Sequence, residues 1–421
     1  MERYSSYKDS GVSWIGDIPE HWEIKKIGSL FVERREKVSD KEYPALSVSK
    51  QGITPQLDTA VKTDNGDNRK KVCKNDFVVN SRSDRKGSCG VSPYTGSVSL
   101  INIVLSPREN IEVQYFHHLF RSNNYIEEYY RIGHGIVADL WTTRYSEMRN
   151  IYIPLPPSDE QRTIVDYIED KTSKIDAYVA DKEKEIELLQ ELKQKTIAEA
   201  VTKGLNPDVK MKEYNSLISS QCPEHWKIMR NKSFLSLTGE KVGNRANEHT
   251  LLSLTTKGVI VRDLESGKGK FPKDFDTYQI VKKDDLVFCL FDIDETPRTV
   301  GLVDTEGMIT GAYTALKVNQ SIALPEYVYC YYLCVDDIKA LKPYYSGLRK
   351  TVRADKFLQL YLPLPPLDEQ QAIVAYIEEK CQKIDTLITE LQAEIDHLKE
   401  YKQRLIADVV TGQVNVQNVI V

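Results

Sequence analysis

Hydrophobic positions in the last sixty residues recur at alternating steps of three and four. The apolar members of this pattern are Ile384, Ile388, Leu391, Ile395, Leu398, Leu405 and Val409. Lys402 occupies a position of the same series and breaks it once. The spacing is typical of an α-helix that buries one narrow stripe against another helix. An earlier segment repeats the stripe at Ile175, Val179, Ile186 and Leu189, with Lys182 in the place of Leu391. Two long helices with slightly polar seams are therefore predicted.

The two segments are copies of each other. Residues 153–202 and 362–411 align without a gap at an offset of 209 residues, and about half of the positions are identical. A weaker repeat precedes each copy, because Pro-Glu-His-Trp occurs at 19–22 and again at 223–226. We interpret the chain as a tandem duplication that keeps its helices constant and varies its globular parts. His21 and His225 recur within this repeat, which favours a structural turn packed by tryptophan over two active sites.

Each repeated helix, about 45 residues long, would extend about 65 Å if unbroken. The seams can be buried against each other or against a partner, and pairing within the chain is the simpler interpretation. A whole globular segment connects the two helices, which allows an antiparallel pair with the globular segments at opposite ends. The alternative is a coiled coil that only stabilises a dimer.

Both helices follow a double proline, which redirects the chain. Ser158 is predicted to cap the first helix, with Gln161 completing a capping box. The second copy has Leu367 at that position, so Asp368 is predicted to cap instead.

The remaining segments mix short β-rich runs with Gly, Asp and Asn turns, and each contains one predicted helix, at 113–130 and at 325–341. The predicted class is α+β, with two globular domains separated and followed by long helices that form an antiparallel coiled coil with pseudo-two-fold internal repeat. The predicted domains are 1–152, 153–203, 204–361 and 362–421.

Composition changes this picture in one respect. The chain has 421 residues and a net charge of −5. Residues 1–152 and 204–361 each carry 22 Lys and Arg against 20 Asp and Glu, so the acidity lies in the helices. The globular segments are mildly basic, and the overall charge does not exclude nucleic acid. No apolar run reaches the roughly 18 to 20 residues of a membrane span, so a cytoplasmic protein is expected. Scattered cysteines and histidines predict no metal site.

Basic and polar side chains concentrate in what appear in the sequence as loops, where they would contact phosphates and base edges of DNA. In the first globular segment, Lys70, Lys71 and Arg85 are predicted to hold phosphates, Asn80, Arg82 and Arg144 to approach bases, and Lys86 to join them. The corresponding candidates in the second segment are Lys268, Lys270, Arg298, Arg349, Lys350 and Arg353. For each cluster alone, a solvated surface is the competing interpretation.

Motifs of the common enzyme classes are missing from the sequence. There is no GxxxxGK[ST] loop, and 267–270 lacks both the leading glycine and the Ser or Thr. No Asn-Pro-Pro-Tyr-like run, GxSxG or HExxH occurs. A non-catalytic protein is the favoured interpretation, and a stand-alone DNA-modifying enzyme is the weakest.

These residues carry a resemblance to the specificity subunits of type I restriction-modification systems. The run Ser10-Gly-Val-Ser-Trp-Ile-Gly-Asp-Ile-Pro-Glu-His-Trp22 resembles the N-terminal signature of that family. The doubled Pro-Leu-Pro-Pro-x-Asp-Glu-Gln resembles its two conserved regions. One departure is that Ser-Gln-Cys, and not a second Ser-Gly-Val-x-Trp-Ile-Gly, precedes the second Pro-Glu-His-Trp.

The resemblance implies two target-recognition domains, each reading half of a bipartite site in double-stranded DNA, with the helices setting the half-site separation. It implies two methyltransferase (modification) subunits as partners, and restriction and translocase subunits in the full complex. S-adenosylmethionine, ATP and magnesium would be used by those partners, and no cofactor by this chain. An assembly clamp that does not touch DNA is the alternative.

Overall fold

The computed structural model describes residues 2–56, 66–108, 111–135, 141–262, 275, 277–346 and 350–417. Two compact units divide the chain: unit 1 is Met1–Glu183 with Gln392–Val421, and unit 2 is Lys184–Leu391. Both units contain part of each long helix, α5 (Ser158–Lys203) and α8 (Leu367–Val410). Within the described ranges, no helix is long and apolar enough to cross a membrane.

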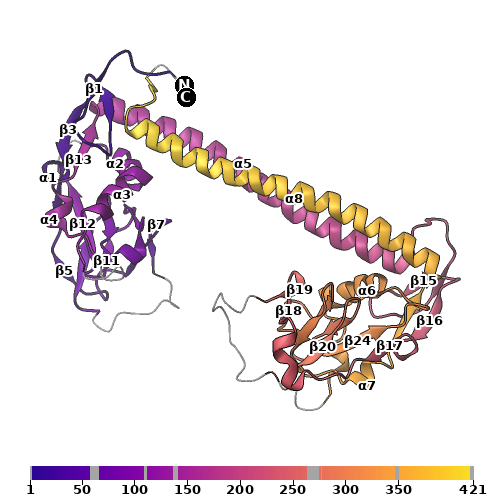
Figure 1. Cartoon of the computed structure of the whole chain (residues 1–421). Coiled ribbons are helices and arrows are strands. Elements are labelled where there is room, and N and C mark those ends of the chain that lie inside the picture. Colours follow the sequence, from indigo (N-terminus) through magenta and orange to yellow (C-terminus); the bar gives the residue numbers. More distant parts are fainter. Residues whose placement is uncertain are drawn as a thin grey trace. The chain divides into compact units, whose positions relative to one another are not determined.

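Unit 1 is built on an antiparallel four-stranded sheet (Figure 1). Its order is β10 (Cys89–Val91), β9 (Phe77–Asn80), β12 (Asn102–Pro107), β4 (Phe31–Glu33). A three-stranded sheet contains β11 (Gly96–Val98), β8 (Arg69–Val72) and β5 (Lys37–Val38), and β6 (Leu46–Ser49) pairs with β7 (Gly52–Pro55). Helices α2 (Val113–Arg121) and α3 (Asn123–Arg131) complete this part of the unit.

Strand β9 is buried on both faces, and this explains its unbroken apolar run. Phe77 and Val79 belong to the main core of unit 1, where the ring centroids of Phe77 and of Phe120 on α2 are 4.9 Å apart. Val78 points the other way, into a small core with Val72 of β8 and Val98 of β11. Because alternate residues of a strand face opposite sides, a strand between two packed layers is apolar throughout.

Unit 2 repeats this architecture. Its four-stranded sheet has the order β17 (Leu235–Leu237), β24 (Thr314–Val318), β21 (Leu286–Phe288), β22 (Val300–Leu302). The smaller pairs are β20 (Gln279–Val281) with β23 (Gly307–Ile309), and β18 (Leu252–Thr255) with β19 (Gly258–Val261). Helix α6 (Pro325–Asp337) packs on the sheet, with Tyr332 5.1 Å from Phe288 between ring centroids (Figure 1).

Further short elements complete each unit, and the two strand pairs among them are repeated. In unit 1 they are β1 (Tyr7–Asp9) with β2 (Asp17–Pro19), β3 (Glu23–Lys26) with β13 (Tyr152–Leu155), α1 (Ile27–Leu30), α4 (Tyr145–Met148) and the 3₁₀ turn η1 (Ser83–Arg85). In unit 2 they are β14 (Met211–Glu213) with β15 (Gln221–Pro223), β16 (Lys227–Arg230) with β25 (Tyr361–Leu364), α7 (Ala354–Phe357) and the 3₁₀ turns η3 (Asn231–Ser233), η4 (Gly243–Glu248) and η5 (Lys342–Tyr344). The α+β class predicted from the sequence is confirmed.

The predicted single helix over 113–130 is wrong, because two helices meet at Ser122. The Ser122 hydroxyl accepts a hydrogen bond from the backbone N–H of Tyr125 at 3.4 Å and so begins α3. A serine N-cap stabilises a new helix start and competes with continuation of the preceding helix. The predicted helix over 325–341 ends early, at Asp337.

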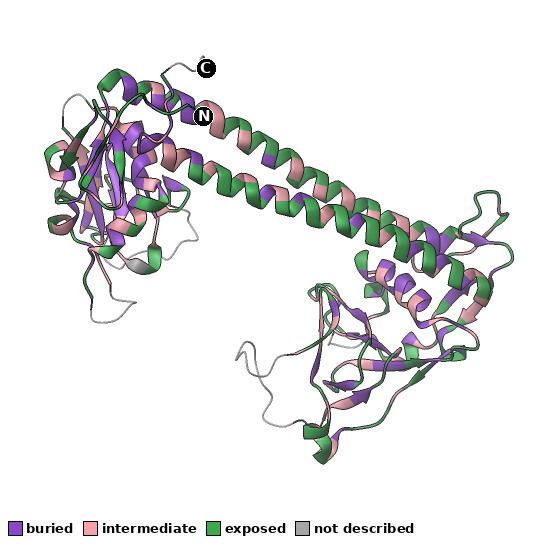
Figure 2. Ribbon diagram, turned by 45° about the horizontal axis from the view of Figure 1, so that its top comes forward, coloured by how far each residue is buried: buried purple, intermediate pink, exposed green. Residues whose placement is uncertain are grey.

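The two long helices run antiparallel within each unit. In unit 1 Lys402 Nζ lies 2.6 Å from Asp176, and in unit 2 Lys193 Nζ lies 2.7 Å from Asp385. The faces turned toward the partner helix are buried or half-buried, and the outer faces are exposed (Figure 2). The predicted seam is confirmed, with Ile384, Leu391, Ile395, Leu405 and Val409 buried. The two seam lysines are half-buried, and Lys182 reaches Glu394 at 3.5 Å.

The last turns of each helix enter the core of the other globular half. Leu405 and Val409 of α8 belong to the core of unit 1, and Ile197 and Val201 of α5 belong to the core of unit 2. Two tyrosines repeat one contact there. Tyr115 donates a hydrogen bond to the carbonyl of Val410 at 2.9 Å, and Tyr327 donates one to that of Val201 at 3.2 Å.

The start of each helix differs from the prediction. The Gln161 side chain does not close a capping box. Its amide donates to the carbonyl of Pro156 at 2.8 Å, and its oxygen accepts from the N–H of Glu112 at 3.2 Å. Helix α8 begins at Leu367, so Asp368 lies in its first turn and does not cap it. The local motif assigned Gln161 to the helix end, but its side chain instead binds the double-proline turn and the backbone of Glu112.

Candidate nucleic-acid interface

Lys70 and Lys71 lie on strand β8, so the prediction that they belong to a loop is wrong. The neighbouring Arg69 is buried and donates to the hydroxyl of Ser97 on β11 at 2.9 Å, which ties this segment into the sheet. Lys70 Nζ contacts Glu33 at 3.1 Å and the carbonyl of Asn102 at 2.8 Å, and its side chain is 15% exposed. An ammonium group held this way is a weak candidate for a phosphate contact.

The Lys71 side chain is slightly more exposed than that of Lys70, but its ammonium group is also paired with a carboxylate. Its ammonium group lies 2.9 Å from Glu36 and 4.9 Å from the centre of the Tyr43 ring. The hydrogen bond with Glu36 raises the pKa of Lys71 above its usual value. The side chain is therefore charged at neutral pH and already paired.

A shallow cavity of about 410 Å³ brings two predicted residues together. Lys70 and Arg144 line it, along with Arg35 and Lys37, which the sequence analysis missed. The run Glu33-Arg-Arg-Glu-Lys37 carried the signal, since three cations occur within five residues. This cavity is a concave basic surface with one lining carboxylate, Glu33.

Arg82 precedes the 3₁₀ turn η1, and Arg85 is its last residue. Their guanidinium groups lie 3.6 and 3.7 Å from the two carboxylate oxygens of Asp84, and the side chains are 42% and 67% exposed. Asn80 accepts the backbone N–H of Arg82 at 3.1 Å, so its side chain orders the turn. Lys86 follows and lies 2.6 Å from Glu127 on α3. Solvent-exposed ion pairs of this kind contribute little to stability and exchange readily for a phosphate.

In unit 2, Arg298 is largely enclosed. It contacts Asp336 at 3.2 Å and Asp337 at 3.1 Å, and Asp336 in turn accepts from the backbone and hydroxyl of Thr299. This network joins the residues just before β22 to the end of α6, and it gives Arg298 a structural role.

Lys350 and Arg353 are the exposed cations of unit 2 among the predicted residues that the structure describes. Lys350 Nζ lies 3.1 Å from Asp294 and 2.8 Å from Glu295, and these hydrogen bonds raise the pKa of Lys350. Arg353 lies 3.0 Å from Asp355 at the start of α7. Lys268, Lys270 and Arg349 lie outside the described residues.

The repeated histidines join each globular half to a helix start. His21 Nε2 lies 2.7 Å from Glu160, and His225 Nε2 lies 2.7 Å from Glu369, at positions 209 residues apart in the two helices. The tryptophans that follow, Trp22 and Trp226, are buried. This arrangement agrees with a packed structural turn. In the described parts of the chain, no three His, Cys, Asp or Glu side chains converge as metal ligands.

Comparison with known proteins gives one family match, which covers both halves of the chain. The family described as type I restriction modification DNA specificity domain matches residues 19–188 and again residues 223–397. Two proteins of Methanocaldococcus jannaschii are similar over nearly their whole length. The putative type I restriction enzyme MjaX specificity subunit is 23% identical over 96% of both chains. The type I restriction enzyme MjaVIII specificity subunit is 22% identical over 95% of both.

Solved structures show the same fold. A chain from a structure concerning complex assembly and conformational transition of the type I R-M system superposes with a TM-score of 0.70 at 14% identity, covering 94% of this chain and 99% of that one. The HsdS subunit from Thermoanaerobacter tengcongensis gives a TM-score of 0.51 at 16% identity, covering 94% and 98%.

Proposed function

Because this chain belongs to the type I restriction-modification DNA specificity family, we propose that it reads a bipartite DNA sequence for a complex that modifies and restricts DNA. One observation carries the proposal: the family match occurs twice, over two halves that share their strand order and their helix contacts. Each half would read one part of the site.

The cations of the two lobes support DNA as the ligand. Exposure favours Arg82, Arg85 and Arg144 in unit 1, and Lys350 and Arg353 in unit 2. We assign Arg85 to phosphate and Arg82 and Arg144 to bases, since arginine can hold guanine in a bidentate manner worth about 1–3 kcal/mol of discrimination. Replacing Arg82 with Ala should relax specificity at one base, whereas Arg85→Ala should weaken all duplexes alike.

Partner subunits would carry the chemistry. We propose two modification subunits that use S-adenosylmethionine, and restriction subunits that use ATP and magnesium, while this chain binds none of these and catalyses nothing. The length of the paired helices would set the separation of the half-sites. Inserting one heptad at equivalent places in both helices should lengthen the preferred spacer, which tests this part separately.

Mapping methylated adenines in cells with and without this gene tests the main proposal. The expected result is a split sequence whose methylation depends on the gene and on the modification subunit. A methylation pattern that does not change when the gene is removed would overturn it. Turnover of DNA by the isolated chain with magnesium would instead identify an enzyme, and unchanged DNA binding after neutralising Arg82, Arg85, Lys86 and Lys350 would favour an assembly clamp.

A further inference from the structure

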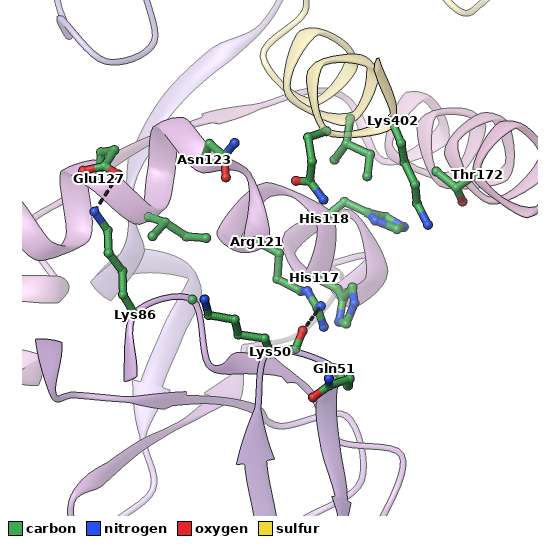
Figure 3. A pocket seen from close by; sticks show the side chains of 14 residues that line it. Lys50, Gln51, Lys86, His117, His118, Arg121, Asn123, Glu127, Thr172 and Lys402 are labelled. Carbon is green, nitrogen blue, oxygen red and sulfur yellow. Dashed lines mark hydrogen bonds and ion pairs between the residues drawn. The ribbon is translucent and has the colours of Figure 1, made fainter. Parts of the chain in front are cut away.

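A basic cleft in unit 1 stands apart from most of the predicted DNA residues. Its volume is about 650 Å³, and its walls include α2, α3, the turn between β6 and β7, α5 at Thr172 and the end of α8 (Figure 3). The residues that give it its character are Lys50, Lys86, His117, His118, Arg121 and Lys402. We call this feature the α2 cleft. Only Lys86 among them was predicted from the sequence to contact DNA.

The α2 cleft has an excess of positive charge. Four cations line it, but Lys86 is paired with the lining carboxylate Glu127 and Lys402 with Asp176, so Lys50 and Arg121 supply the excess. The Arg121 guanidinium donates to the carbonyl oxygen of Lys50 at 2.5 Å (Figure 3). It also donates to the carbonyl oxygen of Cys89 at 3.4 Å. Carbonyl oxygens hold the direction of the guanidinium but do not neutralise its charge. Arg121 is therefore oriented in advance and able to attract an anion.

The two histidines add hydrogen-bond donors without adding charge. His117 Nδ1 accepts the backbone N–H of Val91 at 3.1 Å, so the ring proton of the neutral form is on Nε2. Burial, with the nearby Arg121, lowers the pKa of His117 to about 3 and that of His118 to about 4. The Nε2 atom of His118 is buried and has no hydrogen-bond partner among the described residues. A fixed cation beside neutral N–H donors suits the oxygens of a phosphate.

Unit 2 keeps the scaffold of this cleft but not its chemistry. Tyr115 and Tyr327 bind equivalent helix carbonyls, which aligns α2 with α6 at an offset of 212 residues. At that offset, the counterparts of the cleft side chains His117, His118 and Arg121 are Tyr329, Cys330 and Leu333. Lys402 has its counterpart in Lys193. The repeated scaffold therefore does not require the two histidines and the arginine, and unit 1 alone places these side chains in a cleft.

We propose that the α2 cleft binds a phosphate group of the DNA backbone beside the half-site read by unit 1. This inference rests on the proposed function and adds a sequence-independent contact to it. Arg121 is the main ligand, Lys50 neutralises charge at the rim, and the Nε2–H group of His117 donates to a phosphate oxygen. The apolar lining residues are Ile126 and Ile406, and the described lining includes no Phe, Tyr or Trp on which a base could stack. A backbone phosphate fits this lining better than a free nucleotide.

The test measures the salt dependence of duplex binding by the full chain assembled with modification subunits, on the recognised duplex and on an unrelated one. Arg121→Gln and Lys50→Gln should each lower the slope of log affinity against log salt by about 0.9, the contribution of one phosphate. Both duplexes should weaken by the same factor, so the preference between them stays constant. Arg131→Gln is the matched control, because Arg131 on α3 is exposed, pairs with Glu128 at 2.6 Å and does not line the cleft.

Two results would overturn the inference. One is an unchanged salt slope in both variants. The other is that millimolar inorganic phosphate or triphosphate protects the cleft from a lysine-modifying reagent while duplex DNA does not, which would assign the cleft to a free anion. Lys50→Gln keeps the test valid if Arg121→Gln fails to fold, since Lys50 is exposed. Failure of the proposed function is distinguishable, because the wild-type complex itself would then show no preference for a split site.

Discussion

The Nζ atom of Lys193 lies 2.7 Å from both carboxylate oxygens of Asp385. Lys402 and Asp176, 209 residues away from each, form the same pair at 2.6 Å. The duplication has therefore preserved an interaction across the helix pair as well as the apolar seam, and the antiparallel register is marked by charge in both units.

Reversing one charge should destabilise the helix pair and swapping both should restore it. Lys193→Glu replaces attraction by repulsion and should cost about 1 kcal/mol, since the pair is half-exposed. Adding Asp385→Lys should recover most of that loss. The measurement is the urea midpoint of helix unfolding in a double-mutant cycle. Lys195→Glu, on an exposed position two residues away, is the control and should change little. Equal losses in the single and the swapped variant would contradict the pairing.

Gln370 should be far more important for stability than its neighbour Gln371. Gln370 is fully buried; its amide donates to the carbonyl of Pro365 at 2.9 Å and its oxygen accepts from Leu324 N–H at 2.8 Å. Gln370→Leu would leave these buried backbone groups unpaired and should cost about 2–4 kcal/mol. Gln371→Leu, on the exposed side of the same turn, should be nearly neutral. Thermal or urea unfolding compares the two, and similar losses would contradict the assigned role.

Unit 1 should lose stability as the pH falls from 7 to 5. The folded-state pKa values of His117 and His118 are lowered to about 3 and about 4, below the unfolded value near 6.5. Between these values the unfolded chain binds protons that the folded chain does not. Linkage then removes stability on acidification, by about 2 kcal/mol per histidine over this window. Urea titrations at several pH values should show that the pH dependence of the unfolding free energy is smaller in a His117→Asn, His118→Asn variant. The exposed His397→Asn serves as control, and an unaltered dependence in the double variant would contradict burial as the cause.

Glu295 should restrain DNA binding by unit 2 if Lys350 contacts a phosphate. Glu295 lies 2.8 Å from Lys350 Nζ, and its negative charge would repel the phosphates of the DNA backbone. Two unit charges about 8 Å apart in water interact by about 0.5 kcal/mol, so Glu295→Gln should tighten binding about twofold at low salt. The gain should vanish at high salt because it is electrostatic. Fluorescence anisotropy with a duplex measures this, with the exposed Glu390→Gln on α8 as control. Unchanged binding by Glu295→Gln at low salt would place Lys350 outside the interface.

Sequence patterns predicted the features that depend on local periodicity. The seam from Ile384 to Val409 and the β-rich run at Phe77–Val79 were visible because burial repeats along the chain. Gln161 was assigned to a capping box by local spacing, whereas the fold brings Glu112 and Pro156 close enough to take its side chain. This competition comes from tertiary contacts, so a motif of four residues cannot predict it.

The charge environment of the candidate site could not be predicted from the sequence for a similar reason. Lys350 is held by Asp294 and Glu295, more than fifty residues earlier, and Lys402 closes a cleft whose arginine is Arg121. Counting cations along the chain located basic segments but could not tell paired cations from available ones. The serine that divides α2 from α3 did leave a signal, since Arg-Ser-Asn-Asn at 121–124 is typical of a helix start.

The packing of Leu405 and Val409 into the core of unit 1 sets an order for events on the ribosome. Residues 2–183 emerge first, but part of their core is supplied by residues beyond 391, so all of unit 2 must be translated in between. At roughly 5–20 residues per second, translation of unit 2 takes on the order of ten seconds or more, and the apolar surface of the first lobe stays uncovered during this time. Nascent chains halted before Leu405 should accordingly be cleaved by protease in the first lobe, and chains extended past Val416 should resist. The half of the protein that is made first is the half that is finished last.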